Sequence, residues 1–269
     1  MKSILSYVAV AHPRHIEQAR FVMEIARRHG AHVRFVASSR PVEAAVVGCG
    51  VSTVLEAISR DAAITRITQL RKVLTEVAGG VAWDLVIEDL GLGDAIIQHA
   101  PLSDLIVIGE IERRTLEDHV RSDLAERLVM NSSCPVLILP DEGAYGAAAR
   151  IAVAWKNEPQ AGRAVRDAMP LLRAAGTVTV VAIVSPDVRG ESTEEAAVVA
   201  HLARNGVTAS CRRAYASDAG PAILAQAREV GADLLVMGAY GRSRMLELLM
   251  GGVTRYVMRH LSMPVLLAH

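Results

Sequence analysis

Aromatic residues are scarce in this sequence: Phe, Trp and Tyr together make up 3% of it, although hydrophobic residues reach 51%. The core must therefore be aliphatic, a composition that suits buried parallel strands covered by alanine-rich helices. A charge excess of either sign is also missing, since the formal net charge at pH 7 is zero. A neutral chain has no long-range attraction for nucleic acid or for an anionic membrane, so we expect neither as a partner.

Clustered cysteines, long apolar runs and the common catalytic motifs are missing too. The three cysteines, Cys49, Cys134 and Cys211, are far apart and form no CxxC pair, which indicates neither a disulfide framework nor a zinc site. No apolar run approaches the ~20 residues that a spanning helix needs, and residues 2–11 resemble a first strand rather than a signal peptide. We therefore expect a soluble, cytoplasmic protein. No P-loop and no GxSxG elbow is present, so we assign no catalytic residue and no metal ligand.

What the sequence does contain is an internal repeat. The stretch Asp104–Gly109 (DLIVIG) recurs as Asp233–Gly238 (DLLVMG), and Cys134–Leu139 (CPVLIL) recurs as Met263–Ala268 (MPVLLA). Both pairs are separated by the same 129 residues, so the last third of each half aligns without a gap. Two matched strands in one register predict a duplicated unit, and two unrelated buried strands are the alternative.

Strand and helix patterns alternate in the same order within each half. This alternation predicts the α/β class, with two tandem, doubly wound units that each contain a five-stranded parallel sheet. We place the first unit at residues 1–143 and the second at residues 148–269. A helical pattern near residues 160–175 contains Pro170, which predicts a bend. The expected strands are Ser3–Val10, His32–Ala37, Trp83–Ile87, Asp104–Ile108 and Pro135–Leu139, then Arg150–Ala154, Val178–Val184, Val207–Arg213, Asp233–Met237 and Val265–Ala268; the clearest other helices are His15–His29, Glu194–Arg204, Pro221–Val230 and Gly252–His260.

Glycines gather in the loop that follows the fourth strand of the second half. In an open parallel sheet, ligands bind beyond the carboxyl ends of the strands. Gly238, Gly241, Gly251 and Gly252 all follow that strand, and glycine lets backbone N–H groups approach an anion closely. A helix that begins near Gly252 would add free N–H donors. The pattern indicates a phosphate-binding turn, with a long loop held by turn glycines as the alternative.

The spacing Gly238-x2-Gly241-x9-Gly251 resembles the nucleotide motif G-x2-G-x9-G-[ST] of the universal stress protein family, and residues 253–268 are similar to that family's closing helix and strand. Two tandem units are a common arrangement in the family. The resemblance implies a universal stress protein fold of the adenine nucleotide alpha-hydrolase-like type that binds ATP, with Mg²⁺ accompanying it. For this chain it implies an adenine nucleotide as ligand and a homodimer through the last strand, which we expect to have an exposed edge at Pro264–Ala268.

The resemblance also implies a set of ligand-binding residues in the second half. Phosphate groups would contact the glycines, and the base would lie near the ends of the first two strands. Two positions depart from the family pattern: Gly252 stands where nucleotide-binding relatives usually have Ser or Thr, and Lys156 stands where they usually have Asp. The first change removes a hydroxyl contact, while Lys156 either reaches a phosphate or is only solvated. The implied set is Ala154, Trp155, Lys156, Ile183, Met237, Gly238, Gly241, Arg242, Ser243, Gly251, Gly252, Val253 and Thr254.

The first half lacks most of this glycine pattern. At the positions 129 residues before Gly241, Gly251 and Gly252 stand Glu112, Ser122 and Asp123. Unit charges of one sign at ~4 Å repel by ~1–4 kcal/mol even near a surface, so two carboxylates would oppose a phosphate. We expect a degenerate nucleotide site here, with Asp123 as a helix N-cap or first-turn residue instead.

Together these patterns predict a nucleotide-responsive stress-response or regulatory module with one degenerate and one competent site. We expect no enzyme activity beyond weak ATP hydrolysis, because no cluster of acids, bases or metal ligands accompanies the glycines. Two alternatives stay open. One is an interaction protein of the same fold that binds no nucleotide, favoured by Gly252 and Lys156, and the other is a slow ATP-hydrolysing enzyme.

Overall fold

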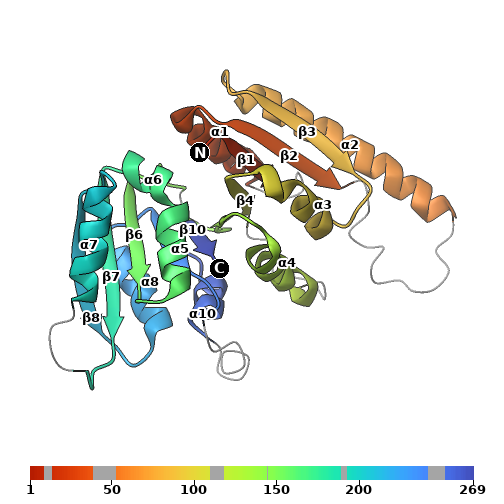
Figure 1. Ribbon diagram of the computed structural model, residues 1–269. Coiled ribbons are helices and arrows are strands. Elements are labelled where there is room, and N and C mark those ends of the chain that lie inside the picture. Colours follow the sequence, from red (N-terminus) through yellow and green to blue (C-terminus); the bar gives the residue numbers. More distant parts are fainter. Residues whose placement is uncertain (9–13, 39–52, 110–117, 144, 189–192, 242–251) are drawn as a thin grey trace. The chain divides into compact units, whose positions relative to one another are not determined.

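The computed structural model describes residues 1–8, 14–38, 53–109, 118–143, 145–188, 193–241 and 252–269, with the side chains of all of these except 53–63 and 118–123. The chain divides into two compact units, Met1–Cys134 and Pro135–His269 (Figure 1). Strands and helices alternate in both, and the strands carry the most deeply buried aliphatic side chains. Each unit is an α/β unit in its own right.

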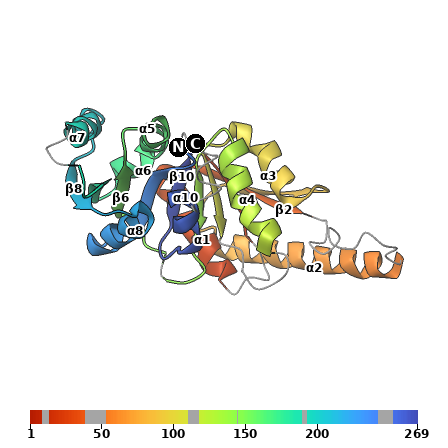
Figure 2. The ribbon, with the colours of Figure 1, turned by 90° about the horizontal axis from the view of Figure 1, so that it is seen from below.

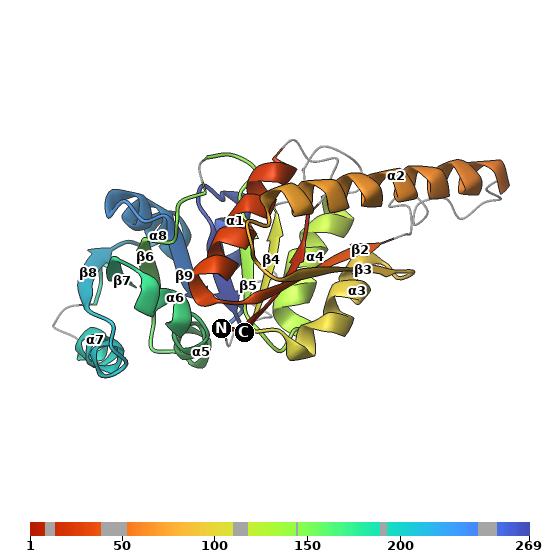
Figure 3. The same cartoon turned by 90° about the horizontal axis from the view of Figure 1, so that it is seen from above.

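The first unit has a sheet of parallel strands in the order β3-β2-β1-β4. Helices α1 and α2 cover one face of this sheet, and α3 and α4 cover the other (Figure 3). Its elements are β1 (Ser3–Tyr7), α1 (His15–His29), β2 (His32–Ser38), α2 (Thr53–Val77), β3 (Trp83–Glu88), α3 (Leu92–His99), the 3-10 helix η2 (Ala100–Leu102), β4 (Leu105–Gly109) and α4 (Asp118–Asn131).

The second unit has its strands in the order β5-β10-β9-β6-β7-β8, all parallel to their neighbours except β5. Helices α5, α6 and α7 cover one face, and α8 and α10 cover the other (Figure 2). Its elements are β5 (Val136–Leu139), β6 (Arg150–Trp155), α5 (Pro159–Asp167), α6 (Met169–Ala174), β7 (Thr177–Val184), α7 (Glu194–Arg204), β8 (Ala209–Tyr215), α8 (Ala219–Glu229), β9 (Leu234–Gly238), α10 (Val253–Arg259) and β10 (Val265–Ala268).

The repeat extends to individual hydrogen bonds. Asp104 precedes β4, and its carboxylate accepts bonds from the backbone N–H groups of Lys2 and Ser3, at the start of β1. Its counterpart Asp233 precedes β9 and accepts from the N–H groups of Ala149 (3.1 Å) and Arg150 (2.8 Å), at the start of β6. Partial burial opposes the charge on Asp104, but the two N–H donors outweigh it and lower the pKa of this carboxyl. The matched aspartates thus fasten the same two strands in both units.

The predicted fold class is confirmed, and most predicted elements agree with the structure to within a few residues. Helices α1 and α7 and strand β10 have the predicted bounds. The bend predicted at Pro170 is a complete break, since α5 ends at Asp167 and α6 begins at Met169. Proline has no N–H to donate to the carbonyl one turn earlier, so the helix cannot continue through it.

The last strand of the chain does not have the exposed edge that we expected. Strand β10 pairs with β9 in parallel and with β5 in antiparallel orientation, with Leu266 opposite Leu137. Strands β5 and β10 are both short, aliphatic and wholly buried. Their pairing satisfies the backbone N–H and C=O groups along the shared edge. The exposed edge expected at Pro264–Ala268 is therefore wrong for this fold, and β10 has no free edge there through which a homodimer could form.

Candidate functional site

The predicted site lies at the carboxyl edge of the sheet in the second unit. Strand β6 continues to β7 on one side and has β9 on the other, so the direction in which the chain crosses the sheet changes between β6 and β9. Such a switch point is where open α/β sheets hold ligands. Ala154 of β6 stands opposite Met237 of β9, and Trp155 stands opposite Ala182 of β7. The fold thus brings together the strand-end residues that the sequence placed in the site, with Ile183 following Ala182.

Trp155 gives this edge a buried hydrogen-bond donor for which the described residues show no acceptor. The indole Nε1 is buried, and no group in the described part of the chain accepts a bond from it. Ala154 and Met237, next to this edge, are 8% and 4% exposed, and strand alternation places them on the opposite face of the sheet from Trp155. A buried donor that lacks a partner is costly unless another molecule accepts its hydrogen. A ligand that offers a hydrogen-bond acceptor at this edge would satisfy the indole N–H.

Gly238, at the end of β9, is required by packing. A Cβ atom on this residue would lie 2.6 Å from the backbone N of Ala161 and 2.6 Å from the carbonyl carbon of Gln160, in the first turn of α5. Backbone atoms cannot move aside as a flexible side chain can. The first unit shows a related contact, because a Cβ on Gly109 would collide with the amide of Gln18 on α1. The repeated glycine therefore lets the first turns of a helix approach the strand end in both units.

Gly241 lies beside a carboxylate that the sequence analysis did not include. A Cβ atom on Gly241 would lie 2.9 Å from Oε2 of Glu158, the residue that precedes α5. The other oxygen, Oε1, lies 2.8 Å from Nζ of Lys156. The Lys156 side chain is 80% exposed and that of Glu158 is 31% exposed. Lys156 is therefore paired with an acid at the site and is not simply solvated.

The turn after β9 is fastened to α10 and to the end of the chain. Tyr240 has a positive φ of 51°, and its backbone N–H donates to Oγ1 of Thr254 at 3.3 Å. Thr254 is 3% exposed, so its hydroxyl holds the turn from within. Next to it, the N–H of Ala239 donates to the carbonyl of Ala268 at 2.8 Å, and a ring nitrogen of His269 lies 3.0 Å from the carbonyl oxygen of Ala239.

The remaining predicted site residues follow this turn. Gly252 precedes α10 with an extended backbone (φ −47°, ψ 163°) and no side-chain cap, and Val253 is the first residue of that seven-residue helix. Arg242, Ser243 and Gly251 lie outside the described residues. Met237, Gly238, Gly241 and Thr254 thus surround one turn, which the strand register places next to the end of β6.

The corresponding edge of the first unit differs from the expectation in one respect. Helix α4 begins at Asp118, so Asp123 is neither its N-cap nor in its first turn. Residues 118–122 contain no glycine or proline, and the helix extends through them. Glu112 lies outside the described residues. The carboxylate argument for a degenerate site in this half stays a prediction.

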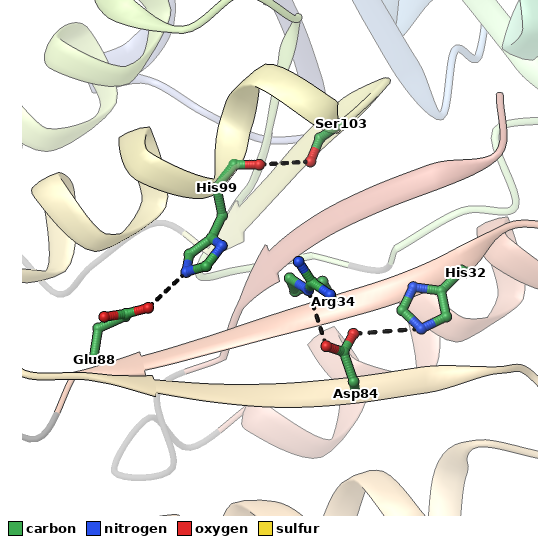
Figure 4. A network of polar contacts seen from close by, with 6 residues as sticks. All are labelled: His32, Arg34, Asp84, Glu88, His99 and Ser103. Atoms are coloured by element: carbon green, nitrogen blue, oxygen red, sulfur yellow. Dashed lines mark hydrogen bonds and ion pairs between the residues drawn. The ribbon is translucent and has the colours of Figure 1, made fainter.

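Two polar clusters in the first unit join β2, β3 and α3 (Figure 4). Asp84 lies opposite Arg34 across the strands, with Nε of Arg34 2.9 Å and Nε2 of His32 3.3 Å from its carboxylate. In the other cluster, Nε2 of His99 lies 2.8 Å from Oε1 of Glu88.

Neither cluster forms a catalytic or metal-binding arrangement. The hydroxyl of Ser103 donates to the backbone carbonyl of His99 and not to its ring, so no Ser-His-Glu triad is formed. No group of three metal-ligating side chains occurs within the described ranges of the chain. The contacts of Asp84 instead pair neighbouring strands.

Comparison of the sequence with known protein families assigns both halves of the chain to one family. A sequence model described as the universal stress protein family matches residues 8–140 and again residues 148–269. No curated protein matches the sequence. None of the helices in the described ranges is long and apolar enough to cross a membrane.

Solved structures show the same fold over the whole chain. One is a universal stress protein from Archaeoglobus fulgidus DSM 4304, with a TM-score of 0.73 and 15% identity over 99% of this chain and 95% of that one. A functionally unknown protein from Pseudomonas aeruginosa PAO1 has a TM-score of 0.59 and 16% identity over 100% and 92%. A putative universal stress protein from Pseudomonas aeruginosa UCBPP-PA14 has a TM-score of 0.57 and 17% identity over 100% and 93%. At these identities the likeness shows the fold alone.

Proposed function

This chain belongs to the universal stress protein family, and from that premise we propose that its second half binds an adenine nucleotide, such as ATP with Mg²⁺, in a regulatory role. The base contacts the ends of β6 and β7, at Trp155 and Ile183. The phosphates contact the backbone of the turn at Gly241. Ligand binding changes the state or the partners of the protein, and ATP hydrolysis is slow or absent.

One observation carries this proposal: a buried indole N–H without a partner lies at the switch point of the sheet. The N–H belongs to Trp155, and no described residue accepts its hydrogen. A purine ring carries acceptor nitrogens at its rim, so it would satisfy this donor. The glycine turn after β9 then lies within reach of groups attached to the purine.

We propose that the first half, residues 1–143, has lost this activity while residues 148–269 keep it. The support is the sequence itself, since Glu112 and Asp123 replace Gly241 and Gly252 at the matched positions. A carboxylate at either position would repel phosphate oxygens. The first half then serves the structure or the regulation of the protein.

Calorimetric titration with ATP, in the presence of Mg²⁺, tests the nucleotide site. We expect the wild-type chain to bind and Gly241→Glu to weaken binding by at least about tenfold, because it places a second carboxylate beside Glu158. A parallel hydrolysis assay should give turnover far below the ~1 s⁻¹ at the low end of typical enzymes.

Gly162→Glu is the matched control. It adds the same charge to the second unit, but a Cβ at Gly162 has no neighbour within 4 Å, and glutamate suits the interior of helix α5. This variant should bind ATP like the wild type. If the wild-type chain bound no adenine nucleotide, an interaction protein without nucleotide would replace the proposal. Fast turnover would identify an enzyme instead.

A further inference from the structure

The carboxylate of Glu158 faces the turn that would hold the phosphates. Its Oε2 atom is the one 2.9 Å from the position that a Cβ on Gly241 would occupy. Lys156 pairs with Oε1, on the other side of the carboxylate. Any group that approaches the backbone of Gly241 from the side of the missing Cβ therefore meets a negative oxygen first.

The paired lysine cannot cancel this charge at the turn. The Lys156 side chain is 80% exposed, so water and salt screen its attraction for a phosphate. The Glu158 side chain is more enclosed, at 31% exposure. It is also held in place, because it precedes α5 and its backbone N–H donates to the carbonyl of Lys156 at 2.6 Å. Of these two side chains, the less screened carboxylate therefore has the larger effect on the local field at Gly241.

We propose that Glu158 is a specificity-determining residue that selects adenine ligands with few phosphate charges over ATP. This inference rests on the proposed function, since it assigns the ligand class of the same site. In the proposed binding mode the base lies toward Trp155 and the phosphates lie toward Gly241, so the charge of Glu158 acts mainly on the phosphates. Each phosphate added next to Gly241 brings more negative charge toward Oε2. Adenosine and AMP therefore bind more favourably, relative to ATP, than they would beside a neutral residue.

The test compares adenosine, AMP and ATP by calorimetry on the full chain, in EDTA so that no divalent cation bridges phosphate and carboxylate. Glu158→Gln keeps the size of the side chain and removes its charge. We expect this variant to bind ATP about tenfold more tightly than the wild type, with the affinity for adenosine unchanged. Lys156→Gln should change the ratio of ATP to adenosine affinity much less, because water and salt screen the exposed lysine.

Glu229→Gln is the matched control, because it removes one carboxylate from the same unit at the far end of the sheet. Glu229 is the last residue of α8, just before β9 starts, whereas the site follows the end of β9. This variant should leave all three affinities unchanged. An unchanged or reduced ratio of ATP to adenosine affinity in Glu158→Gln would overturn the role of Glu158 while leaving the nucleotide site intact. If neither the wild type nor Glu158→Gln bound any of the three ligands, the proposed function would fail as well.

Discussion

Thr254 shows how a single buried hydroxyl can fix the conformation of a turn. Its Oγ1 accepts a hydrogen bond from the N–H of Tyr240 and is buried, so it sets the conformation of the turn after β9. Tyr240 occupies the left-handed region, which costs a non-glycine residue about 1–2 kcal/mol. The hydrogen bond to Thr254 helps to offset that cost. The family resemblance suggested Thr254 as a ligand contact, and the structure gives it this second role.

Thr254→Val should therefore destabilise the protein even when no nucleotide is present. The variant keeps the shape of the side chain but leaves the N–H of Tyr240 without this acceptor, at an expected cost of about 1–3 kcal/mol in the free energy of unfolding. Thermal unfolding followed by circular dichroism measures the loss. Thr254→Ser retains the acceptor and should keep most of the stability. Equal stability of wild type and Thr254→Val would show that this hydrogen bond contributes nothing.

At the site, the sequence identified the strand ends and the glycine turn but not the contacts between them. Trp155 and Gly238 could be placed because the carboxyl ends of parallel strands share one edge of a sheet. Glu158 was missed because its distance to Gly241 depends on how α5 packs against β9, two elements far apart in the sequence. The only available signal was an acid directly before the proline that starts α5. The packing of Gly238 against α5 could not be predicted either, because it depends on the same contact between α5 and β9.

At the scale of elements, two glycines should respond in opposite ways to the same substitution. Gly30 ends α1 in the left-handed conformation (φ 55°), and its N–H bonds back to the last turn of the helix. A Cβ there would have only Nζ of Lys2 nearby, at 3.7 Å, so the penalty is conformational and not steric. Gly162 lies inside α5, where a Cβ meets no atom within 4 Å. Alanine is a better helix former than glycine at such a position.

We expect Gly30→Ala to lower the free energy of unfolding by about 1–2 kcal/mol and Gly162→Ala to raise it by up to about 1 kcal/mol. Each change of 1 kcal/mol corresponds to a shift of roughly 2–4 °C in Tm for a chain of this order of size. Differential scanning calorimetry of the two variants beside the wild type measures both shifts. Shifts of the same sign would contradict this account of either α1 or α5.

The elements themselves were largely readable from the sequence because hydrophobic periodicity and chain breakers are local signals. Helix α1 has the predicted bounds, with Gly30 directly after its last residue. Pro170 divides a single helical pattern into α5 and α6, as a missing N–H requires. The pairing of β5 with β10 could not be predicted from the sequence. Its run of Val136 to Leu139 shows a buried strand, but periodicity does not say which strand lies next to it.

At the scale of the whole molecule, the pairing of β5 with β10 changes the expected assembly. The last strands of the two sequence repeats pair with each other in one chain, with Val265 opposite Ile138 and Leu267 opposite Val136. Strand β8, at the end of the described strand order of the second unit, carries Arg212 and Arg213, which pair with Glu229 and Glu195 on opposite faces of the sheet. Arg213 forms three hydrogen bonds of 2.8, 2.9 and 3.0 Å to the carboxylate of Glu195. Charged side chains of this kind discourage a sheet edge from adding strands of another molecule.

We therefore predict that the full chain is a monomer in solution. Light scattering at micromolar concentrations should give the mass of one chain, 28.8 kDa. Leu137→Pro should shift the mass toward a dimer, because proline disrupts pairing in β5 and leaves the edge of β10 open to a second copy. Leu137→Ala removes a similar amount of side chain but keeps the backbone N–H, so it should be less stable than the wild type and still monomeric. A wild-type dimer that survives Leu137→Pro would mean that the chain associates through another surface.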